Sequence, residues 1–390
     1  MAHTAHSNPE KVREHFVDAA TLDAQATQLA SWIGACKHLV AFTGAGVSTA
    51  AGIPDFRGPN GVWTMRAQGK MCTARTSTLE ALPTLSHMAL VALQDAGKLK
   101  LLISQNCDGL HRRSGMRPEN LAELHGNSNL DRCRKCGREY LRDYRCRRKG
   151  NGVHDHETDR NCHCGAPLFD TVVNFGESLP SKPLRDAYRH SERCDLFLVL
   201  GSSLTVSPAN EMPPTAKRQG AKLVICNLQK TDYDHIADLR VFAKTDDLMS
   251  LVMSKLGVQP KPWLLKRWVK ISVAKHATKT DKKLLLSVDG VESDGIPASI
   301  FSAVSLYTKN NEKPEKSWSA KSQQTTEPFL FNIEVEKLPM TKFTVRLEFI
   351  GHYNEPPLDV QINAANLGTT LYELAYDPRT GRWQTSVVEK

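Results

Sequence analysis

The sequence predicts an α/β fold with a doubly wound parallel sheet, a small inserted module and an antiparallel β domain at the C-terminal end. Three observations predict it. Apolar runs alternate with helical patterns up to residue 257, a polar cysteine-rich stretch interrupts them between residues 130 and 167, and period-two stretches follow residue 284. Each pattern is typical of one part of this architecture.

Four apolar runs predict the strands of the buried sheet. They are residues 38–43 (HLVAFT), 100–104 (KLLIS), 196–201 (LFLVLG) and 222–227 (KLVICN). Short, nearly continuous apolar runs suit strands that are covered on both faces. Helical patterns, for example in residues 85–96 and 247–256, lie between and after these runs, so we expect a Rossmann-like core.

The changes in composition divide the chain into parts. We expect an N-terminal tail at 1–25, an α/β domain at 26–257 with the module inserted at about 130–168, a basic linker at 258–283 and a β-rich domain at 284–390. In the last part, alternating residues such as FTVRLEF indicate an antiparallel sandwich. The polar stretch 310–327 predicts a long loop. The segment GHYNEPP, residues 351–357, is either a hairpin end or a surface that recognises a partner.

Composition excludes some classes of protein. The 390 residues contain no apolar run of about 18 residues, which a membrane span needs, and the first thirty lack the apolar core of a secretory signal. The ten cysteines therefore favour metal binding or free thiols in a reducing compartment over a disulfide framework.

The net charge of +9 and the pI near 9.0 favour an anionic partner. Two segments hold much of this charge. Residues 132–149 contain nine Lys or Arg against two acids, and residues 261–283 contain eight against one. Each segment is either a solvated face or a contact for chromatin, DNA or RNA.

The stretch TGAGVSTAAGIPDFRG, residues 43–58, follows the first predicted strand directly. Gly44 and Gly46 allow a tight turn and a close approach to a ligand, and residues 47–51 are expected to open a helix whose N–H groups face an anion. The spacing differs from G-x-G-x-x-G, so the loop alone is weak evidence for a dinucleotide. The aromatic ring and charges of Asp55, Phe56 and Arg57 suit a flat ring and a ribose.

Polar residues also follow the other three predicted strands. They are Gln105-Asn106-Cys107-Asp108, Gly201-Ser202-Ser203 and Asn227-Leu228-Gln229. Ligands of doubly wound sheets bind at the carboxyl ends of the strands. We therefore expect these segments and the glycine loop to meet in one crevice.

The cysteine module has the spacing of a metal site. Cys133 and Cys136 form one pair, and Cys162 and Cys164 form the second pair after a basic loop. Four thiolates in two pairs predict a closed, tetrahedral Zn2+ site that stabilises the module and takes no part in catalysis. Because one residue separates the second pair, other side chains are possible substitutes. These are Cys146, His154, His156 and His163.

Taken together, the motifs resemble the sirtuins, which are NAD-dependent protein-lysine deacylases. The stretches GAGVSTAAGIPDFRG, QNCDGLHRRSG, ELHGN, NFGE, GSSL and CNLQ stand in the order of that family, with the cysteine pairs among them. The resemblance covers roughly residues 26–256, and GPNGVW with QNCD is most similar to the nuclear branch of sirtuins six and seven. The β-rich C-terminal third lies outside it.

The resemblance implies an NAD+ site and assigns residues to it. The Gly44–Ala45–Gly46 backbone is expected to hold the diphosphate, Phe56 to shield the reacting face and Arg57 to close the loop. The ribose and nicotinamide are expected to meet the QNCD segment, and the adenosine side to meet Ser202 and the later strand exits. The full cofactor set is Gly44, Ala45, Gly46, Ser48, Asp55, Phe56, Arg57, Trp63, Gln105, Asn106, Cys107, Asp108, Gly201, Ser202, Ser203, Asn227, Leu228, Gln229 and Thr245.

His125 in ELHGN is the expected catalytic base, because the resemblance places it there and a pKa of about 6.5 suits proton transfer near neutrality. The implied reaction transfers the acyl group of a lysine to the NAD ribose, is completed by water, and releases nicotinamide, free lysine and O-acyl-ADP-ribose. The segments 174–177 and 203–206 resemble the two edges that clamp the substrate peptide as an added strand.

Three functions remain open at this stage. The first is deacylation of lysines in histones or other nuclear proteins. The second is protein mono-ADP-ribosylation, and the third is a chromatin- or nucleic-acid-bound scaffold with weak catalysis. The branch and the basic segments imply a nuclear location. No membrane partner is expected.

Overall fold

The structure is a computed structural model that describes residues 8–72, 76–148, 150, 152–275, 283–292, 295, 297–308, 318–321, 327–334, 342–363 and 365–388. The chain forms two compact units. The first unit comprises residues 1–128, 152–155 and 171–263, and the second comprises residues 129–151, 156–170 and 264–390.

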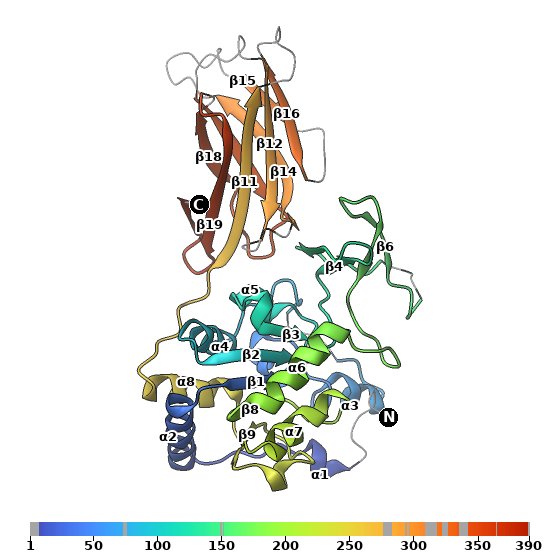
Figure 1. The fold of residues 1–390 in the computed structure, drawn as a ribbon, viewed down its shortest axis with the longest axis vertical. Helices are drawn as coiled ribbons and strands as arrows, with labels where there is room; N and C mark the ends of the chain where they lie inside the picture. Colours follow the sequence, from blue (N-terminus) through green and yellow to red (C-terminus); the bar gives the residue numbers. More distant parts are fainter. Residues whose placement is uncertain are drawn as a thin grey trace. The chain divides into compact units, whose positions relative to one another are not determined.

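The first unit is built on a parallel sheet of six strands (Figure 1), which confirms the doubly wound fold. Its order is β10-β9-β8-β1-β2-β3, so the chain extends the sheet first on one side of β1 and then on the other. The four predicted strands are present with ends within one residue of the prediction. The strands are β1 Leu39–Thr43, β2 Leu99–Ser104, β3 Leu121–Glu123, β8 Leu196–Leu200, β9 Lys222–Cys226 and β10 Leu239–Val241.

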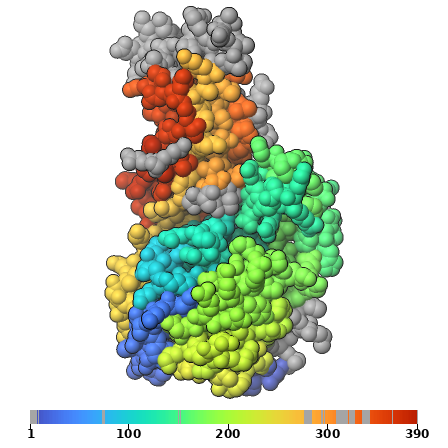
Figure 2. Space-filling model, in the orientation of Figure 1, coloured from blue at the N-terminus to red at the C-terminus, as the bar shows by residue number. Residues whose placement is uncertain are grey.

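Helices cover both faces of this sheet. Successive side chains of a strand point to opposite faces, so alternate residues of one strand pack against different helices. Leu39 and Ala41 of β1 pack in one apolar cluster with α2, α4 and α8, whereas Val40 and Phe42 pack in another with α6 and α7. Figure 2 shows α6 and α7 together on one surface of this unit, in yellow-green. The helices are α1 Pro9–Val12, α2 Ala19–Ala35, α3 Val62–Ala67, α4 Leu85–Asp95, α5 Leu110–Ser114, α6 Ser181–Arg193, α7 Met212–Arg218 and α8 Thr245–Lys255.

Part of the stretch predicted as an N-terminal tail is held against the first unit. The backbone N–H of His15 donates to the Leu228 carbonyl at 2.8 Å, and that of Val17 donates to the Phe242 carbonyl at 3.0 Å. Asp18 then caps α2 by accepting a hydrogen bond from the N–H of Thr21 at 2.9 Å. From residue 8 onward the tail therefore contributes to this unit, and residues 1–7 lie outside the described chain.

The second unit begins with the cysteine module. Its strands are β4 Leu130–Cys133, β5 Glu139–Arg142, β6 Glu157–Asn161 and β7 Pro167–Asp170. They form a sheet of order β13-β5-β4-β7-β6, in which β13, Ala298–Ser299, comes from the C-terminal part of the chain. This association was not indicated by the sequence.

The remainder of the second unit confirms the predicted antiparallel β domain. One sheet has the order β16-β12-β11-β19-β20 and the other β15-β14-β17-β18, and both contribute to one apolar core. Two stacked antiparallel sheets that share a core form a sandwich. The strands are β11 Leu265–Lys275, β12 Lys283–Val291, β14 Phe301–Thr308, β15 Trp318–Lys321, β16 Phe329–Glu334, β17 Lys342–Phe349, β18 Leu358–Asn363, β19 Gly368–Asp377 and β20 Arg382–Val387.

Three sequence predictions in this region can be compared with the strands. Much of the predicted basic linker, 258–283, is occupied by β11. The segment 351–357 connects the antiparallel strands β17 and β18, so it is a hairpin end. Most of the predicted loop 310–327 lies outside the described residues. Among the described helices, none has the length and apolar character that a bilayer crossing requires.

A pair of buried histidines lies in the first unit beneath the end of β1. His111 Nε2 lies 2.9 Å from Thr43 Oγ1, His87 Nδ1 lies 2.8 Å from Thr84 Oγ1, and the two imidazole rings are 4.6 Å apart between centroids. Within the described chain, His87 Nε2 and His111 Nδ1 have no hydrogen-bond partner. Burial lowers the pKa of His87 to about 3 and lowers that of His111 as well. Both rings are therefore neutral in the folded protein.

This pair predicts that the first unit loses stability in acid. Below pH 6.5 the unfolded chain binds protons that the folded chain rejects, so the free energy of unfolding falls by about 1.4 kcal/mol per pH unit for each histidine. The loss continues down to the folded pKa. Thermal unfolding between pH 7.5 and 5.0 should show a shallower pH dependence in His87→Leu than in the native protein. Parallel curves would contradict the assignment.

Candidate functional site

The ends of the central strands of the first unit lie in register. Thr43 at the end of β1 pairs with Ser104 of β2 and Leu200 of β8, and Leu200 pairs with Cys226 of β9. The residue that follows each strand end therefore leaves the sheet next to the corresponding residue of the adjacent strand. Hydrogen bonds continue across these exits, from Gly44 N to Leu200 O at 3.1 Å, Gln105 N to Thr43 O at 3.0 Å and Gly201 N to Cys226 O at 2.9 Å. The predicted segments therefore meet at one edge, where the strand order reverses between β1 and β8.

The glycines of this edge allow two loops to touch. Gly46 N donates to Gly201 O at 2.8 Å. A Cβ on Gly44 would lie 2.7 Å from Gly201 O, and a Cβ on Gly46 would lie 2.6 Å from Gly201 Cα. Gly201 itself has φ of 62°, and its Cβ would lie 2.6 Å from Val47 N. The structure thus gives these glycines a role in loop packing, in addition to the approach to a ligand that we expected.

Residues 47–51 were expected to open a helix. The structure has two 3-10 turns instead, Ala45–Val47 and Thr49–Ala51, and Gly52 ends the second with φ of 85°. Because each turn has only three residues, the segment lacks the helical N-terminus that we predicted as an anion site.

The QNCD segment is tied to the glycine loop by polar side chains. Asn106 Nδ2 donates to Gly44 O at 3.0 Å, and Ser48 Oγ donates to Asp108 Oδ2 at 2.7 Å. The other carboxylate oxygen of Asp108 accepts from Leu110 N at 2.9 Å. Ser48 and Asp108 are both buried, so these bonds form in a region of low dielectric and hold the two segments in one arrangement.

The β8 exit joins the same network. Ser202 Oγ donates to Gln105 Oε1 at 2.8 Å and accepts from Leu204 N at 3.2 Å. Ser203 instead lies 3.0 Å from Thr205, between their hydroxyl oxygens. The structure therefore brings Gly44, Gly46, Ser48, Gln105, Asn106, Asp108, Gly201 and Ser202 together.

His125 lies next to this network and is held in one tautomer. Its Nδ1 donates to the backbone carbonyl of Gln105 at 2.9 Å, which leaves a lone pair on Nε2 of the neutral ring. Burial lowers the pKa of His125, although the bond to Gln105 partly opposes the shift. The ring is therefore neutral at pH 7 and able to accept a proton at Nε2.

Cys107 also contacts His125. Its thiol donates to the His125 carbonyl at 3.1 Å. Burial and nearby carboxylates raise the pKa of Cys107 to about 12. The side chain is thus a protonated packing and hydrogen-bonding group and not a nucleophile.

The Asp55-Phe56-Arg57 segment is organised around Trp63. The ring centroids of Phe56 and Trp63 are 4.7 Å apart, and the Arg57 guanidinium carbon lies 4.3 Å from the Trp63 ring centroid. Burial lowers the pKa of Arg57 to about 10, so it stays charged at neutral pH. Asp55 accepts from Gly58 N at 2.8 Å, and burial raises its pKa. Phe56 remains 46% exposed and able to contact a ligand.

The β9 exit connects residues 55–63, which we call the cofactor loop, with the N-terminal segment. Gln229 Nε2 donates to the carbonyls of Arg57 and Val12, each at 3.1 Å. Asn227 Nδ2 donates to Gln229 O at 3.0 Å, and Leu228 O accepts from His15 N. The sequence did not indicate that residues 12–15 lie here, because no local pattern marks a contact over more than 200 residues.

Thr245 was expected near the adenine. It is the first residue of α8 and is buried. Within the described chain, no hydrogen bond joins its side chain to the glycine loop. Its proximity to a cofactor stays a prediction.

The four predicted cysteines form one cluster in the second unit. All four Sγ atoms lie within 4.8 Å of one another, with 3.6 Å between Cys133 and Cys164 and 3.5 Å between Cys136 and Cys162. A tetrahedral zinc site with metal–sulfur bonds of about 2.3 Å has sulfur–sulfur edges of about 3.8 Å. The donor set and its spacing therefore fit Zn2+, including the Cys162 pair with one intervening residue.

The possible substitute ligands Cys146, His154, His156 and His163 are not members of the described cluster. Cys146 is buried beside Asp131, and burial with that carboxylate raises its pKa. His154 Nδ1 lies 2.7 Å from Glu177, and His156 Nδ1 lies 3.2 Å from Asp170. Among the described residues, none of these side chains belongs to the four-cysteine cluster.

The cluster predicts which cysteine controls metal content. The purified chain should contain about one zinc ion, because four thiolates complete a structural site. Cys136→Ser should lose most of the zinc, whereas Cys146→Ser, its matched control, should keep it. Atomic emission spectrometry measures both. Equal zinc contents in the two variants would contradict this ligand set.

The polar side chains at the sheet edge fit a dinucleotide by their chemistry. The hydroxyl of Ser48, the carboxylate of Asp108 and the amides of Gln105 and Asn106 are groups that bind ribose hydroxyls and a carboxamide. The exposed ring of Phe56 adds a surface for a flat base.

Comparison with known proteins finds similarity to one family. A profile described as the Sir2 family matches residues 69–208. The NAD-dependent protein deacetylase Sirt6 of Drosophila melanogaster is 38% identical over 253 residues, which are 63% of this chain and 80% of that protein. Sirtuin-7 of Homo sapiens is 42% identical over 254 residues, 62% of each chain. SRT1 of Arabidopsis thaliana is 44% identical over 255 residues, 64% of this chain and 53% of that protein.

The chain thus spans about half to three fifths of the length of the plant SRT1 and human sirtuin-7 relatives. A solved Sir2 structure with a p53 peptide and NAD+ is 32% identical, with a TM-score of 0.46, and the match covers 60% of this chain and 98% of that one. The identity to Sirt6 over most of that protein's length decides the assignment: the chain belongs to the Sir2 family of sirtuins.

Proposed function

We propose that the protein removes acyl groups from protein lysine side chains in a reaction that consumes NAD+ and one water molecule and yields free lysine, nicotinamide and O-acyl-ADP-ribose. The observation that carries the proposal is the tautomer of His125. Its Nδ1 is bonded to Gln105 O, so a basic Nε2 stands beside the QNCD segment at the edge where the strand order reverses. Membership of the Sir2 family supports the same reaction class.

Bound NAD+ supplies a glycosidic bond whose cleavage releases nicotinamide and makes its ribose carbon available to the acyl oxygen. His125 Nε2 takes a proton from a ribose hydroxyl, because burial keeps the ring neutral. Gly44, Ala45 and Gly46 would approach the diphosphate with their backbone, and Asn106 and Asp108 would bind the nicotinamide and ribose side. The Phe56 ring is exposed at the loop and is therefore free to cover a bound ligand. In that position it would shield the reacting centre from water.

The adenosine side of NAD+ is assigned to the later strand exits. Asn227, Leu228 and Gln229 follow β9 and are bonded to the cofactor loop through Gln229. Ser202 and Ser203 follow β8, and Thr245 begins α8. These residues are proposed contacts.

The substrate peptide is proposed to bind as an added strand between residues 174–177 and 203–206. Glu177 Oε2 accepts from Asn174 N at 2.7 Å, which closes a tight turn, and Phe175 at its tip is 48% exposed. The Phe175 ring lies 5.8 Å from that of Trp63, between centroids, so the turn is close to the cofactor loop. Main-chain pairing tolerates many peptide sequences, which suits a protein deacylase.

Histone substrates and a nuclear location form the narrower part of the proposal, and similarity to sirtuin-7 supports them. The basic segments give less support. Arg142 pairs with the buried Asp131, Arg134 stacks on Phe169, and Lys266 pairs with Glu373. Because Asp131 is fully buried, its pair with Arg142 favours a structural role for this one cation over contact with DNA or RNA.

The proposal predicts specific products. Incubation of the purified chain with NAD+ and histone peptides that carry acetyl- or long-acyl-lysine should yield free lysine, nicotinamide and O-acyl-ADP-ribose, measured by mass spectrometry. His125→Ala should lower the rate about 10²- to 10⁴-fold, which is the contribution typical of a general base. His235→Ala, which changes an exposed histidine, is the matched control and should keep the native rate.

Other products would contradict deacylation. ADP-ribose attached to protein without free lysine would establish mono-ADP-ribosylation instead. NAD+ that stays intact with every peptide would favour a scaffold. Equal rates in His125→Ala and the native chain would remove His125 as the base.

A further inference from the structure

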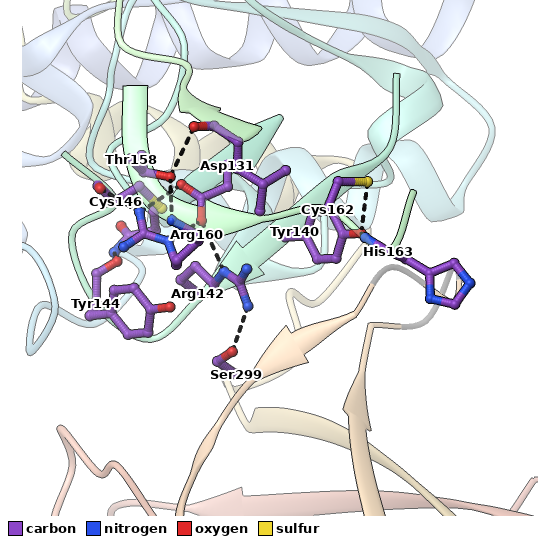
Figure 3. A network of polar contacts seen from close by, with 12 residues as sticks. Asp131, Tyr140, Arg142, Tyr144, Cys146, Thr158, Arg160, Cys162, His163 and Ser299 are labelled. Atoms are coloured by element: carbon purple, nitrogen blue, oxygen red, sulfur yellow. Dashed lines mark hydrogen bonds and ion pairs between the residues drawn. The ribbon is translucent and has the colours of Figure 1, made fainter. Parts of the chain in front are cut away.

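The cysteine module and the C-terminal sandwich belong to one compact unit. Four consecutive residues, 140–143, contact the cysteine cluster at one end and the sandwich at the other. Figure 3 shows Tyr140 beside Cys162 and Arg142 beside Ser299. We call residues 140–143 the coupling segment.

Tyr140 is the contact with the cysteine cluster. Its hydroxyl lies 3.2 Å from Cys162 Sγ and accepts from His163 N at 2.9 Å. The side chain is buried. A change in the position of Cys162 therefore acts directly on β5, the strand that contains Tyr140.

The next two residues of β5 hold a strand of the C-terminal part. Leu141 pairs with Ala298 and Arg142 with Ser299, as parallel neighbours. Arg142 also donates from Nη1 to Ser299 Oγ at 2.6 Å. Gly290 of β12 lies behind β13, where a Cβ would come within 2.3 Å of Ala298 O. Strand β13 thus forms the edge strand of the module's sheet. The missing side chain at Gly290 leaves space for β13 next to β12.

Arg142 is fixed by a buried carboxylate. Asp131, which is fully buried, accepts from Arg142 Nε at 3.1 Å and from Arg160 Nε at 2.6 Å. Arg160 also donates to Cys146 O at 2.5 Å (Figure 3). A buried charge without its partner is strongly destabilising. Arg142 therefore stays in the position where it pairs with Asp131.

Asp143 receives contacts from three separate segments of the C-terminal part. Its carboxylate pairs with Arg267 of β11, its carbonyl accepts from His352 Nε2, and its N–H donates to Ser299 O at 3.3 Å. Arg267 is buried, and His352 belongs to the β17–β18 loop. Three contacts on one residue make Asp143 the centre of the attachment.

We propose that the cysteine module is the docking surface for the C-terminal sandwich, and that the coupling segment makes this docking depend on metal in the cysteine site. Loss of the metal frees Cys162, Tyr140 loses its partner, and β5 no longer holds β13 and the 351–357 loop. This role extends the structural zinc site beyond its own module. It is independent of the proposed catalytic function.

Hydrogen–deuterium exchange of the full, zinc-loaded chain tests the docking. Asp143→Ala should raise exchange in peptides that cover β13 and residues 351–357 by about tenfold or more, the factor that corresponds to about 1.4 kcal/mol. Zinc content should stay at the native level. Asp159→Ala removes an exposed pair with Arg148 in the same module and is the matched control, which should leave both segments protected.

A second arm tests the dependence on metal. Removal of zinc with a chelator should raise exchange in the same two segments, while peptides of α2 in the first unit stay protected. Unchanged exchange of β13 and the loop in Asp143→Ala or in the metal-free chain would overturn the proposal. An equal rise in every peptide, α2 included, would also overturn it, since it would indicate global unfolding. If Asp143→Ala is insoluble, His352→Ala replaces it, with the loop as the readout.

Discussion

The sheet edge that carries the proposed site depends on the register of four parallel strands. Thr43, Ser104, Leu200 and Cys226 end level with one another, so the chain leaves the sheet four times along one line. Parallel strands with a crossover on each side place these exits at the point where the strand order reverses. The exits can touch because Gly44, Gly46 and Gly201 have no side chains at the contact. Side chains there would separate β1 from β8.

The polar groups of the site follow from this packing. Buried polar atoms need partners, and here the partners lie on adjacent exits: Asn106 bonds to Gly44, Asp108 to Ser48, and Ser202 to Gln105. The carbonyl of Gln105 then sets the tautomer of His125. The second unit uses the same device, since buried Asp131 fixes Arg142, which holds Ser299. In both units a network of satisfied hydrogen bonds fixes the orientation of a side chain more tightly than non-directional apolar packing could.

Local patterns predicted much of this arrangement. The four central parallel strands, β1, β2, β8 and β9, are continuous apolar runs, so their ends were predicted within one residue, and the members of the four-cysteine cluster followed from cysteine spacing. The short edge strands β3 and β10 were not predicted. Other features could not be predicted, because they are contacts between residues far apart in sequence. Asp143 with Arg267, Leu141 with Ala298, and Gln229 with Val12 leave no local signal. The expected helix at 47–51 failed because the contact with Gly201 takes the chain through 3-10 turns.

The central claim is that contact between the β1 and β8 exits builds the NAD+ site. Isothermal titration calorimetry of NAD+ with the native chain and Gly201→Ala tests it most directly, because a Cβ at φ of 62° would meet the backbone of Val47 and Gly46. The account predicts binding by the native chain and at least about tenfold weaker binding by the variant. The circular dichroism spectrum and zinc content should be unchanged. Equal Kd values for the two proteins, or no binding by either, would contradict it.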